Sequence, residues 1–281
     1  MTQSLAGRTV LLTGAAGGIG RVLTKSLLDA GANVMAADIS EGGLEALRNE
    51  NDANGLACSA LDISDAAACA AMVAATQTRF GGLDILINNG ALGMGAIRPD
   101  HMANLIGMDE ITPETWDRFV SVNLSGAWYL TRAALPVMKD AGWGRIITIT
   151  TSFFTMLRAK FHPYGPVKAG LEAMSAGHAS EFAGTGITVN VVVPGGPVNT
   201  PMVHVEANDY RAEDLIQPSQ MAPPIVWLCS DEANDVTGNR YVAAHWDETV
   251  SVADARAASQ APIAWPDLAG SPVWPGGKPD E

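Results

Sequence analysis

The chain has 281 residues, of which 47% are hydrophobic and 17% charged, and a formal net charge of −13. It is long enough for one large α/β domain with a sizeable core. The acidic balance argues against a nucleic-acid or anionic-membrane surface, because both need clustered lysine and arginine. No apolar run reaches the ~20 residues of a membrane span, and the N-terminus lacks a signal-peptide core, so we expect a cytoplasmic protein with no membrane partner. Cys58, Cys69 and Cys229 are scattered outside metal-ligand spacings, and no metal is expected.

The first part of the chain is typical of a βαβ unit. From Thr9 an apolar strand leads into a glycine-rich turn, an amphipathic helix and a second strand at 33–37. Gly14, Gly18 and Gly20 in that turn are spaced G-x-x-x-G-x-G. Glycines there let the backbone turn tightly and let a pyrophosphate approach the helix N-terminus. Because a strand precedes the turn and a helix follows it, the pattern predicts dinucleotide binding.

Asp38 ends the second strand, about 20 residues beyond the turn. A carboxylate there can accept both ribose hydroxyls of an adenosine and would repel a 2′-phosphate. No arginine or lysine lies inside the glycine turn or directly after Asp38, so NAD is favoured over NADP. Two alternatives stay open. Asp38 could be a solvated cap of the next segment, and Arg21 could reach a phosphate.

Strands and helices then alternate along the chain. We expect strands at 56–61, 83–88, 145–150, 187–193 and 240–244, and helices at 43–50, 64–79, 112–139, 163–182 and 221–230. Asp62 closes the third strand, where it can accept from an adenine amino group. Asn88, Asn89 and Gly90 close the fourth, where the Asn side chains can tie neighbouring strand ends together. All of these positions belong to the ligand edge of such a sheet.

Three further segments have no regular pattern. The loop at 91–111 is expected to form a wall of a substrate site, with His101 as a surface residue, and the loop at 197–218 is a candidate lid. The tail from about Trp246 carries Trp265 and Trp274 and is expected to dock on its own or a neighbouring subunit.

Asn123 interrupts the apolar stripe of the helix at 112–139. A buried amide is costly unless it is hydrogen-bonded, so Asn123 is either a satisfied core amide or a site residue reaching inward.

Tyr164 and Lys168 are four residues apart, which places them on one helical face. A close ammonium stabilises a phenolate, so we expect Lys168 to lower the pKa of Tyr164 towards about 7. Tyr164 could then serve as a general acid or base near neutral pH. The alternative is an ordinary surface pair.

In this order the motifs resemble the short-chain dehydrogenase/reductase family, over residues 5 to 245. They are TGAAGGIG at Thr13 to Gly20, Asp38, LD at 61–62, NNG at 88–90, Asn123, a strand-five hydroxyl, Tyr164-x-x-x-Lys168 and PGG at 194–196. The resemblance implies a doubly wound (Rossmann) α/β fold with seven parallel strands, a single domain over 1–246 and a tail over 247–281. It implies that the cofactor is held by Gly14, Gly18, Ile19, Gly20, Asp38, Asp62, Ile63, Asn89, Gly90, Tyr164, Lys168, Pro194, Gly195 and Thr200.

The resemblance also implies catalytic roles. Tyr164 exchanges a proton with the substrate oxygen, Lys168 holds the nicotinamide ribose, and Asn123 supports a water-mediated proton path from Lys168. A strand-five hydroxyl orients the substrate carbonyl. The commonest spacing counts back from Tyr164 to Thr151, but we take Ser152, the serine of the TTS run, with Thr151 as the alternative. The family's NNAG reads NNGA here.

The expected reaction is reversible hydride transfer between NAD(H) and a secondary alcohol or ketone, in a homo-oligomer (tetramer or dimer). One rival is a catalytically silent NAD(H) sensor or scaffold, and another is an epimerase or dehydratase that uses bound NAD. The substrate is open. Cations beside the expected cleft favour an anionic or polyhydroxylated substrate, the aromatic and methionine side chains there favour an apolar one, and a subunit interface is the third interpretation. The cations are Arg98, Arg158, Lys160 and His162, and the apolar residues are Phe153, Phe154, Met156 and Phe161.

Overall fold

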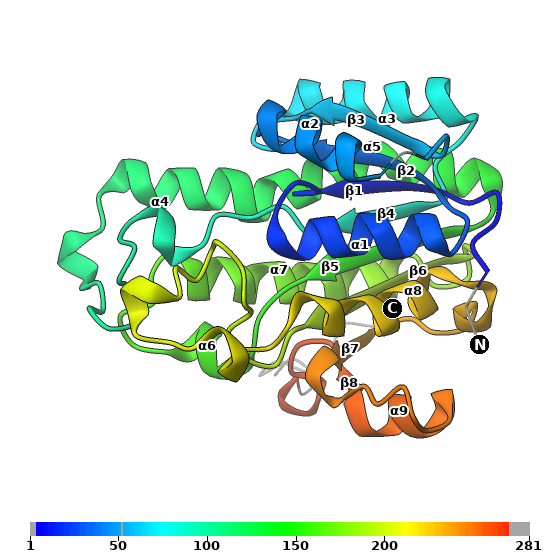
Figure 1. Cartoon of the computed structure of the whole chain (residues 1–281). Helices are drawn as coiled ribbons and strands as arrows, with labels where there is room; N and C mark the ends of the chain where they lie inside the picture. The colour runs from blue at the N-terminus through cyan, green and yellow to red at the C-terminus, as the bar shows by residue number, and fades with distance from the viewer. Residues whose placement is uncertain (1–3, 52, 270–281) are drawn as a thin grey trace, which may run out of the picture.

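The computed structural model describes residues 4–51 and 53–269, and its strands form one sheet in the order β3-β2-β1-β4-β5-β6-β7-β8 (Figure 1). The strands are β1 Thr9–Thr13, β2 Asn33–Asp38, β3 Leu56–Ala60, β4 Ile85–Asn88, β5 Gly144–Ile149, β6 Ile187–Val193, β7 Asn239–Val242 and β8 Gln260–Pro262. β1 to β7 are parallel, and β8 pairs antiparallel with β7. The doubly wound fold is confirmed, with one strand more than the expected seven, because the tail adds β8 to the edge of β7.

Helices cover both faces of this sheet. They are α1 Gly18–Asp29, α2 Glu41–Glu50, α3 Ala66–Phe80, α4 Pro113–Val120, α5 Gly126–Ala141, α6 Phe153–Leu157, α7 Tyr164–Glu181, α8 Ala222–Cys229 and α9 Val252–Ser259. α1, α2 and α8 share one buried cluster with the sheet, and α3, α5 and the end of α7 share the other. α4 and α6 extend beyond the sheet at the end opposite the N-terminus (Figure 1). That end is where the strands deliver their carboxyl-terminal residues.

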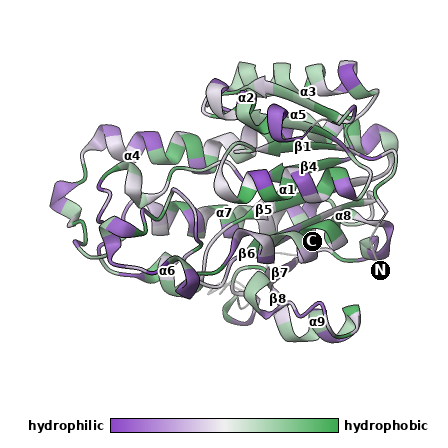
Figure 2. Ribbon diagram, viewed as in Figure 1, coloured by the Kyte–Doolittle hydropathy of each residue, from purple (hydrophilic) through white to green (hydrophobic). Residues whose placement is uncertain are grey.

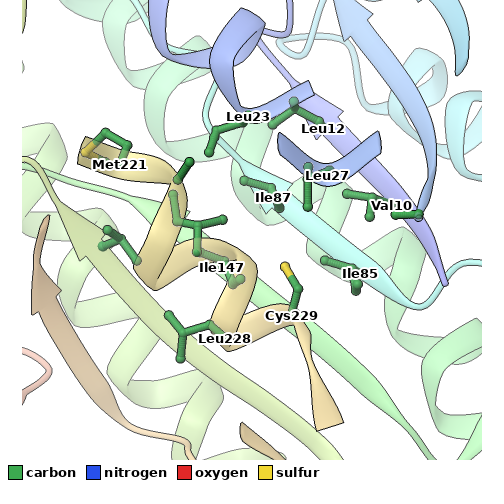
Figure 3. Close-up of a cluster of buried hydrophobic side chains, with 14 of the residues drawn as sticks. Val10, Leu12, Leu23, Leu27, Ile85, Ile87, Ile147, Met221, Leu228 and Cys229 are labelled. Atoms are coloured by element: carbon green, nitrogen blue, oxygen red, sulfur yellow. The ribbon is translucent and has the colours of Figure 1, made fainter. Parts of the chain in front are cut away.

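The central strands are buried on both faces, which is why they read as continuous apolar runs. Hydrophobic residues gather on these strands and on the inner helix surfaces (Figure 2). On one face, side chains of β1, β4 and β5 meet α1 and the segment around α8 (Figure 3). The residues labelled there are Val10, Leu12, Leu23, Leu27, Ile85, Ile87, Ile147, Met221, Leu228 and Cys229. The two buried clusters, one on each face of the sheet, therefore fix the strand ends that carry the site.

The helix expected at 112–139 is interrupted. α4 and α5 are joined by a π-helical segment at Ser121–Ser125, with Asn123 at its centre. Such segments are rare and frequently lie at functional sites. The sequence pattern could not reveal this break, because the apolar stripe continues through it.

The described part of the tail packs on its own chain. Ile263 joins Val191 and Val193 of β6 in a small buried cluster. The Trp265 ring lies 5.8 Å from the Phe153 ring, so the tail reaches the start of α6. Trp274 lies outside the described residues. Within 4–51 and 53–269, none of the helices has the length and apolarity needed to cross a membrane.

Candidate active site

The glycine-rich turn forms a close-fitting cradle at the end of β1. A Cβ on Gly20 would lie 2.0 Å from the Gly14 carbonyl oxygen, and one on Gly18 would lie 2.5 Å from Cγ2 of Thr200. Gly14 has φ +61° and lies directly against Gly90, where its Cβ would be 2.7 Å from the Gly90 Cα. These approaches need glycine, and they leave the N-terminus of α1 open to a phosphate. The turn and Thr200 therefore fit a dinucleotide pyrophosphate.

Asp38 lies beside this turn. Its Oδ2 accepts from the backbone N–H of Ala16 at 3.0 Å, and its Oδ1 accepts from that of Ser40 at 2.9 Å. Arg21, the alternative phosphate ligand, forms an ion pair with Glu50 at 2.6 Å and also donates to the Ala16 carbonyl. The cation nearest to the turn is therefore already neutralised, while the Asp38 carboxylate has no cationic partner among the described residues.

Asn89 ties the ends of β1 and β4 together, as expected, whereas Asn88 does not, because its Nδ2 donates to the Thr131 hydroxyl on α5 at 3.5 Å. Its Nδ2 donates to the carbonyls of Thr13 and Gly14 at 2.9 and 3.0 Å. The Thr13 hydroxyl accepts from the backbone N–H groups of Asn89 and Gly90. We had assigned no role to Thr13, although a hydroxyl residue at the end of a strand is a signal for such a tie.

Asp62 and Ile63 follow β3 at the same edge. Asp62 Oδ1 accepts from the backbone and hydroxyl of Ser64. Ile63 lies against two glycines, since a Cβ on Gly90 or Gly126 would come within 3.3 or 2.8 Å of it.

Asn123 is a satisfied buried amide. Its Oδ1 accepts from the Leu92 N–H at 2.7 Å and its Nδ2 donates to the Leu92 carbonyl at 2.9 Å. Leu92 lies between Ala91 and Gly93, both of which line the main cavity. The amide therefore fixes one wall of that cavity.

A cavity of about 490 Å³ brings the remaining expected residues together. It is lined by Ile19, Asn89, Thr151, Ser152, Tyr164, Lys168, Pro194, Gly195 and Thr200. It thus runs from the glycine turn to the start of α7. The lining does not include Gly14, Gly18, Gly20, Asp38, Asp62, Ile63, Gly90 or Asn123.

The two candidate hydroxyls at the end of β5 make different contacts. The Thr151 side chain is close enough to the Tyr164 phenol to lower its pKa, against the larger effect of burial. The Ser152 hydroxyl caps α6, where it accepts from the Thr155 N–H at 3.2 Å and lies 3.0 Å from the Thr155 hydroxyl. Of the two, Thr151 is the one that influences the Tyr164 phenol.

The expected lowering of the Tyr164 pKa is wrong in this structure. Burial raises the pKa of Tyr164 to about 12, and the Thr151 side chain offsets only part of that effect. Burial also lowers the pKa of Lys168 to about 8, against the opposing influence of Glu172. The Lys168 ammonium lies 5.8 Å from the tyrosine ring centroid and donates to the Ile149 carbonyl at 2.7 Å. Desolvation therefore outweighs the attraction of the ammonium for a phenolate.

A buried ion pair lies directly behind these residues. Glu172, fully buried on α7, accepts from Arg240 Nε at 2.9 Å and from the Thr150 hydroxyl at 2.6 Å. Arg240 also donates to the Thr151 carbonyl at 3.0 Å. The backbone N–H of Ala264 in the tail donates to Glu172 at 3.3 Å. This network fixes the strand end that carries Thr151, and sequence reasoning missed it because its members are far apart in the chain.

The two irregular loops enclose the outer end of the cavity. Asn208 joins them, because its Oδ1 accepts from the Met102 N–H at 2.7 Å and its Nδ2 donates to the Pro99 and Val203 carbonyls. His101 is buried and lines the cavity, so its expected place on the surface is wrong. The loop folds inward around Met94, Ile106 and Phe161, and no periodic pattern could have signalled that.

Comparison with known proteins identifies the family. The family model described as short chain dehydrogenase matches residues 8–211, which include the glycine turn, Tyr164 and Lys168. The chain belongs to the short-chain dehydrogenase/reductase family. It is therefore an oxidoreductase that binds a nicotinamide cofactor and acts on alcohol or ketone groups.

Relatives of this short-chain dehydrogenase span almost its whole fold. The 3-oxoacyl-[acyl-carrier-protein] reductase FabG of Salmonella typhimurium is 34% identical over 244 residues, covering 84% of this chain and 95% of the reductase. The D-beta-hydroxybutyrate dehydrogenase of Cupriavidus necator is 30% identical over 256 residues, covering 83% and 95%. A crystal structure of a 3-ketoacyl-(acyl-carrier-protein) reductase from Brucella melitensis, complexed with NADH, has a TM-score of 0.72 and 28% identity, covering 83% and 95%.

Proposed function

We propose that this protein is an NAD-dependent alcohol dehydrogenase or ketone reductase in which Tyr164 exchanges the proton. The observation that carries the proposal is that Tyr164, Thr151 and Lys168 line one cavity, which extends to the glycine turn. The relatives named for reducing 3-oxoacyl groups and oxidising hydroxybutyrate support a secondary alcohol or its ketone as the reacting group.

NAD is the proposed cofactor. The glycine cradle fits its pyrophosphate, Asp38 is available to the adenosine ribose, and Asp62 with Ile63 is proposed to bound the adenine. A 2′-phosphate would meet the Asp38 carboxylate, and Arg21 is paired with Glu50. The similar Brucella reductase structure holds NADH, which supports the same choice. When bound, the nicotinamide accepts or supplies the hydride.

The chain's own residues handle the proton. With a pKa raised to about 12, Tyr164 is protonated near neutral pH and can donate to a carbonyl oxygen during reduction. We propose Thr151, rather than Ser152, as the hydroxyl that donates a second hydrogen bond to that oxygen. Lys168 is proposed to hold the nicotinamide ribose, and Asn123 stays a predicted member of a water-mediated proton path. Homo-oligomer formation also stays a prediction.

A screen of secondary alcohols and ketones, followed by NADH absorbance with both NAD and NADP, tests this function. We expect turnover of part of the panel and a preference for NAD. An Asp38→Asn variant should lose most of that preference, because it removes the charge that repels a 2′-phosphate. Binding of NADH without turnover of any compound would favour the sensor, and NAD retained through purification would favour an epimerase or dehydratase.

A further inference from the structure

Arg158 places a positive charge at the cavity wall without an acidic partner. Its Nη1 lies 3.7 Å from the Met102 sulfur, and its guanidinium lies 4.8 Å from the Phe161 ring centroid and 5.9 Å from that of Phe154. No acidic side chain is among its contacts in the described parts of the chain. Because arginine stays charged in proteins and Arg158 is only half-buried, its guanidinium is free to pair with an anion. An anion that enters the cavity would supply the counter-charge for this guanidinium.

Three other cations of this region already have partners, and Lys160 is exposed and outside the cavity lining. Arg98 pairs with Glu110, Arg240 pairs with Glu172, and Lys168 donates to the Ile149 carbonyl. Among the described residues that line the cavity there is no aspartate or glutamate, although the whole chain carries a net charge of −13. An anion in the cavity would therefore be attracted by Arg158 and would not be repelled by a lining carboxylate.

His101 adds a second polar group to the same cavity. It is 6% exposed, and its Nδ1 is buried without a hydrogen-bond partner in the described chain. Its ring centroid lies 6.2 Å from that of Phe161, the ring over which Arg158 packs. An unpartnered buried nitrogen is unfavourable, so a ligand oxygen that reaches it would be stabilised.

Phe161 contacts both Arg158 and Tyr164. Its ring centroid is 4.8 Å from the Arg158 guanidinium and 6.4 Å from the Tyr164 ring centroid. The cavity that all three line also includes Met94 and Met202, so a ligand that reaches both Arg158 and Tyr164 would meet apolar side chains.

We propose that Arg158 binds the carboxylate of the substrate, and that the substrate is a hydroxy acid or oxo acid with an apolar segment between its carboxylate and the reacting carbon. A carboxylate matches the guanidinium fork with two parallel hydrogen bonds. The inference rests on the proposed function, because Tyr164 defines the reacting carbon.

The test is a series of secondary hydroxy acids of increasing chain length, each offered as the free acid and as its methyl ester. For the best acid we expect kcat/KM roughly 10- to 100-fold above that of its ester, as for a charge-assisted hydrogen bond. Arg158→Gln should remove most of that ratio through KM, and Arg158→Lys should restore part of it. The matched control Arg98→Gln, whose arginine is paired with Glu110, should keep the wild-type ratio. Thermal unfolding checks that each variant is folded.

Two outcomes would overturn the inference and are distinguishable. Turnover in which the acid-to-ester ratio is the same in wild type and Arg158→Gln overturns the carboxylate site alone, as does a preference for phosphorylated polyols over the acids. Absence of turnover for every acid, ester, alcohol and ketone, with either cofactor, overturns the proposed function and this inference with it.

Discussion

Replacing Arg240 with leucine should destabilise the protein strongly, because it leaves Glu172 as a fully buried carboxylate without its cation. Removing one partner of a buried ion pair costs about 3–5 kcal/mol. Glu172 would keep its hydrogen bonds from the Thr150 hydroxyl and the Ala264 N–H, so we expect the lower end, about 3 kcal/mol. Unfolding should then occur some 6–12 °C lower, at ~2–4 °C per kcal/mol for a domain of about this size.

Urea unfolding of wild type and three variants tests the contribution of the pair. The double variant Glu172→Leu/Arg240→Leu should recover most of the stability lost in Arg240→Leu, since buried pairs are often replaceable by apolar residues. Arg211→Leu, which breaks the exposed pair with Asp214, should change the free energy of unfolding by less than about 0.5 kcal/mol. The reasoning is refuted if Arg240→Leu is as stable as wild type, or if the double variant is no more stable than the single one.

Three further predictions concern single positions. Thr151→Val should lower kcat by roughly 10²–10³-fold, and Ser152→Ala should lower it by much less. If steady-state kinetics show the larger loss of kcat for Ser152→Ala, Ser152 is the catalytic hydroxyl. Lys168→Met should exceed wild type in stability at pH 7 by up to about 3 kcal/mol, because burial lowers the Lys168 pKa from 10.5 to about 8. That advantage should shrink between pH 8 and 10.5, where the folded lysine has lost its proton and the unfolded one still holds it, and a constant difference in urea unfolding would contradict it. Gly20→Ala should destabilise the protein by more than about 2 kcal/mol and weaken NADH binding. Gly177→Ala, where α7 has open space for a Cβ, should stabilise it by about 0.5–1 kcal/mol. Equal shifts of the two variants in thermal unfolding would contradict the close packing of the glycine turn.

The features that could be predicted from the sequence are those set by residues close together in the chain. The glycine turn, Asp38 at the end of β2 and the tie made by Asn89 follow from residue type and position along a strand–turn–helix unit. The Tyr164 and Lys168 pair follows from helical spacing alone. Parallel strands buried on both faces have few alternatives to a doubly wound sheet, so the fold could be predicted from the alternation of elements.

The rest depended on contacts between distant parts of the chain. The sign of the Tyr164 pKa shift was mispredicted because burial, which is a tertiary property, outweighs the nearby ammonium. His101 is buried because the loop at 91–111 folds inward, and that loop has no hydrophobic periodicity from which the burial could be predicted. β8 adds to the edge of β7 through backbone pairing that its short sequence, QAP, does not specify. The choice between Thr151 and Ser152 turns on a single position: the family's commonest spacing points to Thr151, and the preference for a serine led to Ser152.

The measurement that tests the central claim most directly compares wild type with Tyr164→Phe, which removes only the phenolic oxygen. Turnover of the best compound from the panel should fall by roughly 10²–10⁴-fold, while the dissociation constant for NADH, measured by fluorescence, should stay within about threefold. Substantial turnover by Tyr164→Phe would contradict the account, because the proton would then be exchanged by a different group.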